Sequence, residues 1–321
     1  MTTKPENRDK PLVVIAIGGN SLITDSEHMS VVDQYRAAGE TAANIAPIVN
    51  DGYRVVVTHG NGPQVGFILL RSELAKEALH QVPLANCVAD TQGSIGMQIA
   101  QSLQNEFRDQ GREQQVVAII TQVVVDPDDP SFDKPTKPIG PFMSETEAQQ
   151  HAEDDGWAIA EDANRGWRRV VPSPTPIEII ELPAIRTLLD SGALVVAAGG
   201  GGIPVIYKPD GSLRPRPAVI DKDAASCLLA QCLGAKVLVF STDVDKVALN
   251  FGTREQTEIE RVTAAECLKY LDEGHFAAGS MQPKIEAALA FIEAGGEEVI
   301  ITRPPCLADA MRGTHGTHIV P

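Results

Sequence analysis

The sequence alternates between short apolar runs, typical of buried β-strands, and amphipathic segments, typical of helices. Six apolar runs occur, at residues 11–20, 53–62, 115–125, 192–202, 235–245 and 297–303. In the segment 283–296, apolar residues recur at helical spacing until Gly295 and Gly296 end the pattern. Strands that alternate with helices form right-handed βαβ units, so the sequence predicts an α/β fold with a mainly parallel central sheet.

The composition agrees with a sheet that is covered on both faces. Hydrophobic residues make up 43% of the 321 residues but aromatic residues only 4%, so Val, Ile, Leu and Ala must fill the interior. Parallel strands that are buried on both faces are rich in these aliphatic residues. The chain is long enough to bury one large core or two joined cores.

The charge of the chain excludes some classes of partner. The formal net charge is −16, which argues against a nucleic-acid partner and against an anionic membrane surface. No apolar stretch approaches the roughly 18 to 20 residues of a membrane span, and the polar leader 1–10 has no signal-peptide pattern. An anionic ligand is still possible, because it needs only a locally positive pocket.

The spacing of cysteine and histidine predicts no metal site made by protein side chains. The five cysteines are scattered and lack the paired spacing of zinc ligands, and the seven histidines form no HxH or HxxxH cluster. Free thiols in a cytoplasmic protein account for the cysteines. They are Cys87, Cys227, Cys232, Cys267 and Cys306.

Prolines interrupt the alternation in the middle of the chain. Residues 126–141 read DPDDPSFDKPTKPIGP, and prolines return at 172, 174 and 176. Proline lacks the N–H that a central strand needs, so residues 126–178 are predicted to leave the sheet. Apolar side chains such as Trp157 and Trp167 favour a small subdomain or lid over an exposed loop. The excursion divides the chain into an N-terminal half, 11–181, which includes it, and a C-terminal half, 182–321.

Three glycine-rich turns follow predicted strands. Ligands of open parallel sheets bind at the carboxyl ends of the strands, and free backbone N–H groups there form anion sites whose usual guest is phosphate. The predicted phosphate-binding residues are Gly18, Gly19, Asn20, Gly60, Asn61, Gly62, Gly199, Gly200 and Gly201. No P-loop motif is present, and GNGPQVG does not have the spacing of a dinucleotide fingerprint.

Three lysines are candidates for the positive charge that such a site needs. Lys137 is braced by prolines at 135 and 138, Lys222 lies between Asp221 and Asp223, and Lys284 lies near the start of a predicted helix that Ser280 could cap. A lysine near a helix N-terminus is unfavourable against the helix dipole unless an anion neutralises it. A bound phosphate would remove this cost for Lys222 and Lys284.

With these features the sequence resembles the carbamate kinases of the amino acid kinase superfamily, over about residues 11–304. The phrases of the proline-rich excursion are specific to carbamate kinases. The matching segments are IGGNSL (17–22), HGNGPQVG (59–66), DTQGSIGMQI (90–99), TQVVVDPDDP (121–130), PTKPIGPF (135–142), EDANRGWRRVVPSP (161–174), GGGGIPV (199–205), VIDKDAAS (219–226) and GHFAAGSMQPKIEAA (274–288). Departures are small, such as Ser241 where threonine is common.

The resemblance implies a fold and a reaction. The expected fold is a three-layer α/β/α sandwich with about eight central strands, a small protruding subdomain over the active site, and a homodimer. The expected reaction is the reversible transfer of a phosphoryl group between ATP and carbamate, giving ADP and carbamoyl phosphate, with Mg²⁺ as cofactor. The N-terminal half is expected to hold the carbamoyl side and the C-terminal half the nucleotide.

The resemblance also implies roles for residues. The glycine turns with Asn20 and Asn61 would hold the transferred phosphoryl group and carbamate, and Lys137, Lys222 and Lys284 would surround the phosphates. Asp221 and Asp223 would either orient Lys222 and Lys284 or hold Mg²⁺ through water. The residues expected near the nucleotide are Ser241, Asp243, Val244, Asp245 and Met281.

Two other functions fit parts of this pattern. Another kinase of the superfamily, acting on a small acid or a nucleoside monophosphate, would share the glycine turns but lack the PTKPIGPF insertion. A nucleotide-binding regulator without catalysis would not need all three lysines. The direction of the reaction stays open, because a catalyst accelerates both directions, and so does the pathway that supplies carbamoyl phosphate.

Overall fold

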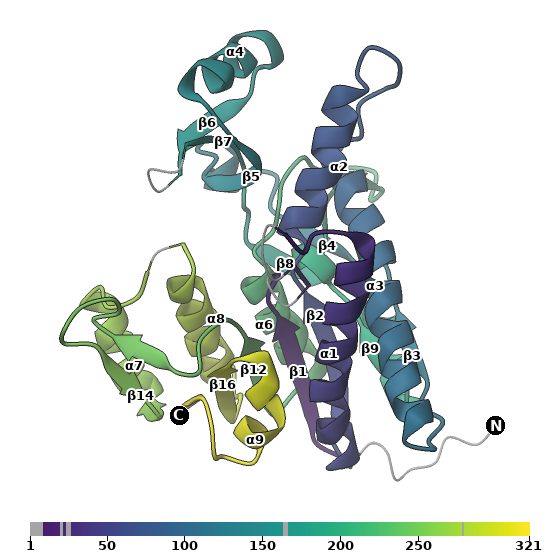
Figure 1. Cartoon of the computed structure of the whole chain (residues 1–321), viewed down its shortest axis with the longest axis vertical. Helices are drawn as coiled ribbons and strands as arrows, with labels where there is room; N and C mark the ends of the chain where they lie inside the picture. The colour runs from purple at the N-terminus through teal and green to yellow at the C-terminus, as the bar shows by residue number, and fades with distance from the viewer. Residues whose placement is uncertain (1–8, 20–21, 24–26, 163–165, 278) are drawn as a thin grey trace.

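The centre of the molecule is an eight-stranded sheet (Figure 1). The computed structural model describes residues 9–19, 22–23, 27–162, 166–277 and 279–321. Neighbouring strands are parallel, except that β17 is antiparallel to β16. In spatial order the strands are β15 (Arg261–Thr263), β17 (Thr317–Val320), β16 (Glu298–Thr302), β12 (Val237–Ser241), β1 (Leu12–Ile17), β2 (Arg54–His59), β9 (Leu194–Val196) and β3 (Val116–Ala118).

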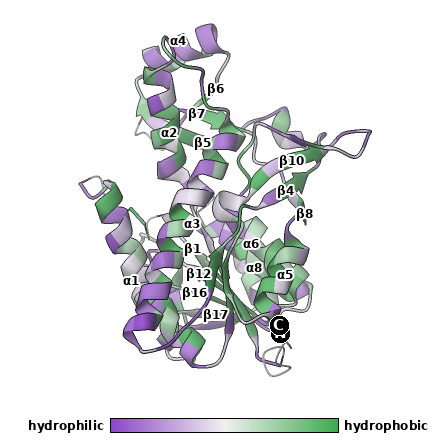
Figure 2. Ribbon diagram, turned by 90° about the vertical axis from the view of Figure 1, so that its right-hand side faces the viewer, coloured by the Kyte–Doolittle hydropathy of each residue, from purple (hydrophilic) through white to green (hydrophobic). Residues whose placement is uncertain are grey.

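Helices cover both faces of the sheet, which confirms the predicted three-layer α/β/α arrangement. Successive side chains of a strand point to opposite faces, and in β1 Val13 and Ile15 belong to one buried core whereas Val14 and Ala16 belong to the other. The first core is closed by α1 (Val31–Asn50), α3 (Leu84–Asp109) and α9 (Leu307–Met311). The second is closed by α5 (Leu182–Asp190), α6 (Lys222–Leu233), α7 (Ala264–Asp272) and α8 (Met281–Glu293). The strands at the centre are accordingly mainly hydrophobic (Figure 2), and every residue of β1 is apolar and buried.

The prediction of one strand over residues 115–125 is wrong. The structure has two short strands there, β3 in the main sheet and β4 (Gln122–Val125) in a second, four-stranded sheet of order β11-β10-β4-β8. The chain turns at Thr121, whose hydroxyl donates to the Ile119 carbonyl at 2.9 Å and whose N–H donates to the Gln92 side chain at 2.8 Å. Both strands are apolar, so periodicity could not reveal the break between them. The other strands of this sheet are β8 (Pro176–Ile179), β10 (Ile203–Tyr207) and β11 (Leu213–Pro215).

Residues 137–171 form a separate small unit, called the lid below, that stands above the main sheet beside α2 (Gly62–Leu74) (Figure 1). It consists of the antiparallel strands β5 (Lys137–Met143), β7 (Trp167–Val171) and β6 (Ala158–Glu161), with α4 (Glu145–Asp155). Its prolines lie on β5, an edge strand, where a missing N–H leaves no ladder hydrogen bond unmade. Residues 176–179 have already returned to the body, because β8 pairs with β4.

The predicted halves 11–181 and 182–321 share the main sheet. β9, which belongs to the second half, lies between β2 and β3 of the first. The division at residue 181 into a carbamoyl half and a nucleotide half therefore stays a prediction from the sequence. The remaining elements are η3 (Pro130–Phe132), η4 (Gly199–Gly201), β13 (Val247–Leu249), β14 (Thr257–Ile259) and η5 (Pro304–Cys306). Among the described residues, no helix combines the length and the apolar character needed to cross a membrane.

The sheet register brings the glycine turns together. Ile17, the last residue of β1, lies between His59 of β2 and Ser241 of β12. The Gly60 N–H donates to the Ile17 carbonyl, and the Gly18 N–H to the Ser241 carbonyl, each at 3.0 Å. The turns after β1 and β2 are thus adjacent at one edge of the sheet, where parallel strands end.

We expect the stability of the sheet to depend on the protonation of His318. Its ring nitrogens face two acceptors, the Glu298 carboxylate at 2.9 Å and the His315 carbonyl at 2.8 Å, so the doubly protonated ring is favoured. The hydrogen bond to Glu298 raises the pKa of His318 in spite of its partial burial. The His318 hydrogen bond lowers the pKa of Glu298, although burial opposes this.

The variant His318→Gln should therefore lose most stability in a defined pH window. Folding raises the pKa of His318, so this group stabilises the folded state below its unfolded pKa of 6.5. Folding lowers the pKa of Glu298, so this group stabilises the folded state above its unfolded pKa of 4.5. The loss of unfolding free energy should be about 1 to 2 kcal/mol between these values and should shrink as pH rises from 6.5 through the folded pKa of His318. Urea unfolding between pH 5 and 9 measures it, and a loss that stays constant over this range would contradict the assignment.

Candidate active site

A cavity of about 340 Å³ opens at the carboxyl ends of β1 and β2, between the main sheet, the lid and the first turns of α6 and α8. We call it the lysine cavity, because it brings together all three predicted lysines from distant parts of the chain. The predicted site residues that line it are Gly18, Gly19, Gly60, Asn61, Gly62, Lys137, Gly200, Asp221, Lys222, Asp223, Asp243 and Lys284. Asn20 lies outside the described residues.

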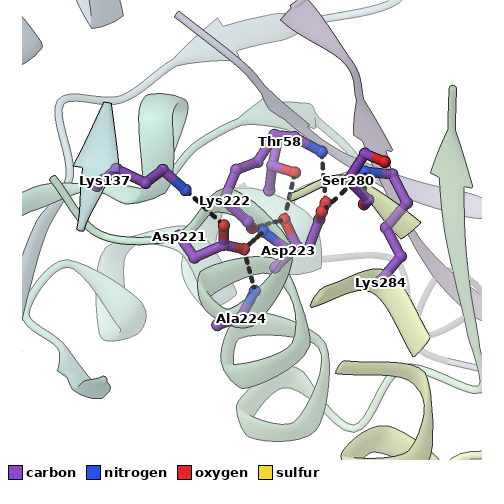
Figure 3. A network of polar contacts seen from close by, with 9 residues as sticks. Thr58, Lys137, Asp221, Lys222, Asp223, Ala224, Ser280 and Lys284 are labelled. Carbon is purple, nitrogen blue, oxygen red and sulfur yellow. Dashed lines mark hydrogen bonds and ion pairs between the residues drawn. The ribbon is translucent and has the colours of Figure 1, made fainter. Parts of the chain in front are cut away.

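Asp223 holds two of the lysines at once (Figure 3). One carboxylate oxygen accepts from Lys222 Nζ at 2.5 Å and the other from Lys284 Nζ at 3.0 Å. Lys222 is the first residue of α6 and Lys284 the fourth of α8, so the packing of these helices against each other forms the site. The Asp223 side chain is only 6% exposed, and a carboxylate so buried needs charged partners.

Asp221 holds the third lysine and also begins α6. One carboxylate oxygen accepts from the backbone N–H groups of Asp223 at 2.8 Å and Ala224 at 3.3 Å, as an N-cap does. The other accepts from Lys137 Nζ at 2.6 Å (Figure 3). Burial alone would raise the pKa of Asp221, but the charge of Lys137 and these hydrogen bonds hold it below its usual value. Asp221 thus contacts the lid lysine, whereas Asp223 contacts Lys222 and Lys284.

The network leaves an excess of positive charge in the cavity. Four cationic side chains, the three lysines and Arg168, face three carboxylates, those of Asp221, Asp223 and Asp243, among the described lining residues. Each ammonium also has three N–H donors, more than Asp221 and Asp223 accept. The N-terminus of α6, a helix of 12 residues, adds to this positive potential. Such a site binds a polyanion and stabilises negative charge that moves across it.

The four glycines after β9 allow a close approach between parts of the protein itself. At Gly199 an added Cβ would lie 2.3 Å from His59 Nε2, and at Gly200 it would lie 2.1 Å from Asn61 Nδ2. Three residues of this turn, Gly199, Gly200 and Gly201, were predicted to bind phosphate. Of these three, only Gly200 lines the lysine cavity, and Gly199 and Gly201 are buried. Positions 199 and 200 thus need glycine because the side chains of His59 and Asn61 lie so close. The sequence pattern did not reveal this requirement.

Buried hydrogen bonds fix the side chains behind these turns. Asn61 Nδ2 donates to the Thr91 hydroxyl at 2.8 Å, and Gln92 Nε2 donates to the Gly199 carbonyl at 2.9 Å. Thr91 and Gln92 of the segment DTQGSIG thus hold the glycine turns in place. This segment is among those that match the carbamate kinases, which could have indicated such a role. Burial, together with the nearby charge of Lys222, lowers the pKa of His59 to about 4 in spite of the contact with the Gly60 carbonyl, so the ring is neutral at pH 7. Because its Nδ1 faces the Gly60 carbonyl at 3.0 Å, that nitrogen carries the proton.

A second, smaller cavity of about 200 Å³ adjoins the first and is called the side cavity. The two share Thr242, Asp243 and Ser280, and the side cavity is also lined by Val244 and Met281. Ser241, which is fully buried at the end of β12, and Asp245, which pairs with Arg303 at 2.5 Å, line neither of these two cavities. Ser280 precedes α8 as predicted, but its side chain makes no capping hydrogen bond; its carbonyl accepts from Lys284 at 3.3 Å.

Sequence reasoning missed Arg168. It lines the lysine cavity from β7 of the lid, and its guanidinium donates to the Gly140 carbonyl at 3.1 Å and pairs with Asp162 at 3.0 Å. The paired arginines of the segment WRRVV were the available signal. In the described part of the chain, one group of three possible metal-ligating side chains occurs, and it lies at the lid, not in the lysine cavity: Glu73, His151 and Asp155.

Comparison with known proteins places these features in a family. The model of the amino acid kinase family matches residues 11–303. The chain is 50% identical over 315 residues to the carbamate kinase-like protein YahI of Escherichia coli K12, covering 97% of this chain and 99% of that protein. It is 46% identical over 312 residues to a carbamate kinase of Pyrococcus horikoshii, covering 96% and 99%. A solved carbamate kinase from Giardia lamblia bound to AMP-PNP superposes with a TM-score of 0.91 at 40% identity, covering 97% and 99%.

The variant Gly200→Ala should destabilise the protein more than Gly211→Ala. Both glycines have positive φ, +66° and +81°, but an added Cβ meets Asn61 at the first and open space at the second. The backbone strain is therefore common to both variants, and overpacking should cost Gly200→Ala about 1 to 3 kcal/mol more. Urea unfolding measures both. In the background Asn61→Ala the excess should shrink, whereas equal losses in the two single variants would contradict the contact.

Proposed function

The chain belongs to the amino acid kinase family, and we propose that it catalyses the reversible transfer of a phosphoryl group between ATP and carbamate, with ADP and carbamoyl phosphate as the other pair. The observation that carries this proposal is the network in which Asp221 and Asp223 hold three lysines around one cavity. Near full-length identity of 46% to a protein named carbamate kinase supports the same substrate.

The network suits in-line phosphoryl transfer. In this reaction the protein supplies little covalent chemistry and mainly aligns the reactants and neutralises charge on the moving group. Carbamate and the nucleotide are both anions, so their approach costs Coulomb energy that Lys137, Lys222 and Lys284 offset. Carbamate is already a competent nucleophile, and the mechanism therefore assigns no general base.

The two adjoining cavities suggest where each reactant binds. The lysine cavity contains the turns after β1 and β2, with Gly19 and Asn61, and would hold the carbamoyl group and the transferred phosphoryl group. The side cavity, with Val244 and Met281, would hold the nucleoside. Thr242, Asp243 and Ser280 line both, so the phosphates of the nucleotide would pass between them. The family resemblance also predicts Ser241, Gly199 and Gly201 near the ligands. Because these residues are buried, we propose an indirect role for them, as support of the residues that line the cavities.

Mg²⁺ fits this site as a partner of the nucleotide. Carboxylate oxygens suit the ion, and Asp243 lines the lysine cavity beside Asp223. The oxygens of Asp221 and Asp223 already accept hydrogen bonds from lysines and backbone, so these carboxylates would reach the ion mainly through water. When bound, Mg²⁺ would neutralise part of the phosphate charge.

The assembly and location of the enzyme are also proposals. The resemblance to carbamate kinases predicts a homodimer. The five cysteines are all free thiols, which agrees with the cytoplasmic location that their spacing predicts.

The variants Lys222→Ala and Lys284→Ala should each lower turnover more than tenfold. Each removes an ammonium that stabilises charge in the transition state. Lys236→Ala is the matched control, because Lys236 is half exposed and pairs with Glu297 away from both cavities. Steady-state rates with ADP and carbamoyl phosphate measure the effect, together with unfolding midpoints to show that the variants are folded. Near-normal turnover in both lysine variants would remove their assigned role.

A coupled assay of ATP formation tests the function itself. The purified chain with Mg²⁺, ADP and carbamoyl phosphate should produce ATP, and acetyl phosphate in place of carbamoyl phosphate should give a much lower rate. ATP formation that prefers another acyl phosphate would favour a different kinase of the family. Nucleotide binding without any ATP formation would favour a regulatory protein.

A further inference from the structure

A third cavity, of about 310 Å³, lies between α2 and the lid and is called the lid cavity. It adjoins the lysine cavity: Arg168 of β7 lines the lysine cavity, the next residue, Arg169, lines the lid cavity, and Ile139 of β5 lines both. Adjacent side chains of a strand point to opposite faces, so Arg168 and Arg169 leave β7 on different sides. The proposed function makes no use of the lid cavity.

The walls of the lid cavity are mainly apolar. Its volume is near the lower end of the range for small-molecule sites. The apolar side chains come from α2, from the loop after it and from the lid, and they are Leu69, Leu70, Val82, Ile139, Phe142, Met143 and Trp157. An organic group of about four to ten heavy atoms, such as an isobutyl or benzyl group, would bury its surface against them.

Arg169 is the cation in this apolar wall. Its guanidinium lies over the Trp157 ring, 4.7 Å from the centroid, and His151 stacks on the same ring at 4.2 Å. Among the residues that the structure describes, no carboxylate lies within 4.0 Å of Arg169. Burial lowers the pKa of Arg169, although the more distant Asp155 opposes this. Its charge is therefore partly desolvated without an ion-pair partner, a cost that an anionic ligand would remove.

The acidic groups in the wall already have partners. Glu73 accepts from Lys76 at 2.6 Å and from Gln81 at 2.9 Å. Glu147 accepts from the backbone N–H and the hydroxyl of Ser144, each at 2.8 Å, in the capping box of α4. Local donors thus occupy both carboxylates, and Arg169, which has no ion-pair partner among the described residues, remains the cation that a ligand can satisfy.

We propose that the lid cavity is a second ligand site, which binds a small carboxylate with an aromatic or branched apolar group. The carboxylate would pair with the Arg169 guanidinium, which offers a planar fork of N–H donors held in place by Trp157. The apolar group would fill the space between α2 and β5. No bond is made or broken in this step.

Occupation of the lid cavity would act on the lysine cavity through two strands. β5 carries Lys137 at its start and Ile139, Phe142 and Met143 further on, and Ile139 lines both cavities. β7 carries Arg168 and Arg169 side by side. A ligand wedged between α2 and the lid would favour one lid position, and so one position of Lys137 relative to Asp221.

Isothermal titration of the full chain with phenylacetate tests the proposal. Phenylacetamide has the same shape without the charge, and phenethylamine has the opposite charge. EDTA in the buffer removes any cation that Glu73, His151 and Asp155 could hold. We expect phenylacetate to bind in the millimolar range or tighter, also in the presence of saturating ADP, and the two other compounds to bind at least tenfold more weakly. No phenylacetate binding, tighter binding of the amine, or binding that requires added zinc would overturn the proposal.

Variants locate the binding. Arg169→Gln should weaken phenylacetate at least tenfold, whereas Arg112→Gln should not, although Arg112 also lies over an aromatic ring, that of Phe107 at 5.4 Å. Leu70→Trp should block the cavity from its exposed rim without removing the charge, since Leu70 is 43% exposed. Unchanged affinity in both Arg169→Gln and Leu70→Trp would place the ligand elsewhere.

Kinetic measurements test whether occupation of the lid cavity acts on the lysine cavity. Of the experiments in this subsection, only this one rests on the proposed function. Saturating phenylacetate should change the KM for carbamoyl phosphate at least twofold in the wild type and leave Arg169→Gln unchanged. Binding that depends on Arg169 without any kinetic effect would keep the site and overturn the coupling. Competition between phenylacetate and carbamoyl phosphate that persists in Arg169→Gln would assign the effect to the lysine cavity instead.

Discussion

The site depends on two carboxylates that keep three ammonium groups together in a small cavity. Without Asp221 and Asp223, the charges of Lys137, Lys222 and Lys284 would repel one another in surroundings of lower dielectric than water. The carboxylates in turn need the lysines, because a buried charge that loses its partner is costly. Asp221 adds a structural role, since the same side chain starts α6. The start of α6, the contact with the lid lysine Lys137 and the charge of the cavity are therefore linked through one residue.

The lid is part of the site through its two strands. β5 delivers Lys137 and β7 delivers Arg168, and neither strand belongs to a sheet of the body. Prolines are tolerated in β5 because it is an edge strand, and they stiffen the segment that carries the lysine. A covering lid suits a substrate that is unstable in water, such as carbamate. The same strands also line a second, apolar cavity between the lid and α2.

Some parts of the site were predictable from local sequence. The position of Lys222 between two aspartates, at the start of a helix, follows from helix-capping preferences, and the structure has Asp221 at the N-cap. The strand-end turns of Gly18 and Gly60 follow from apolar runs that end in glycine. By contrast, the apolar run 115–125 hid a break between two sheets, because β3 and β4 have the same composition. Arg168 was missed because nothing local distinguishes it from Arg169, its neighbour on the opposite face.

By itself the sequence determined the alternation of strands and helices around the main sheet, the glycine turns at the strand ends, and the charged residues available to a site. These are consequences of periodicity and of backbone conformation, which act over a few residues. Only the tertiary structure decided that Asp223 takes two lysines and Asp221 the third, and that Gly199 and Gly200 make room for His59 and Asn61. The physical reason is that these contacts join residues far apart in the chain. Their geometry depends on strand order, sheet register and helix packing, which no local pattern specifies.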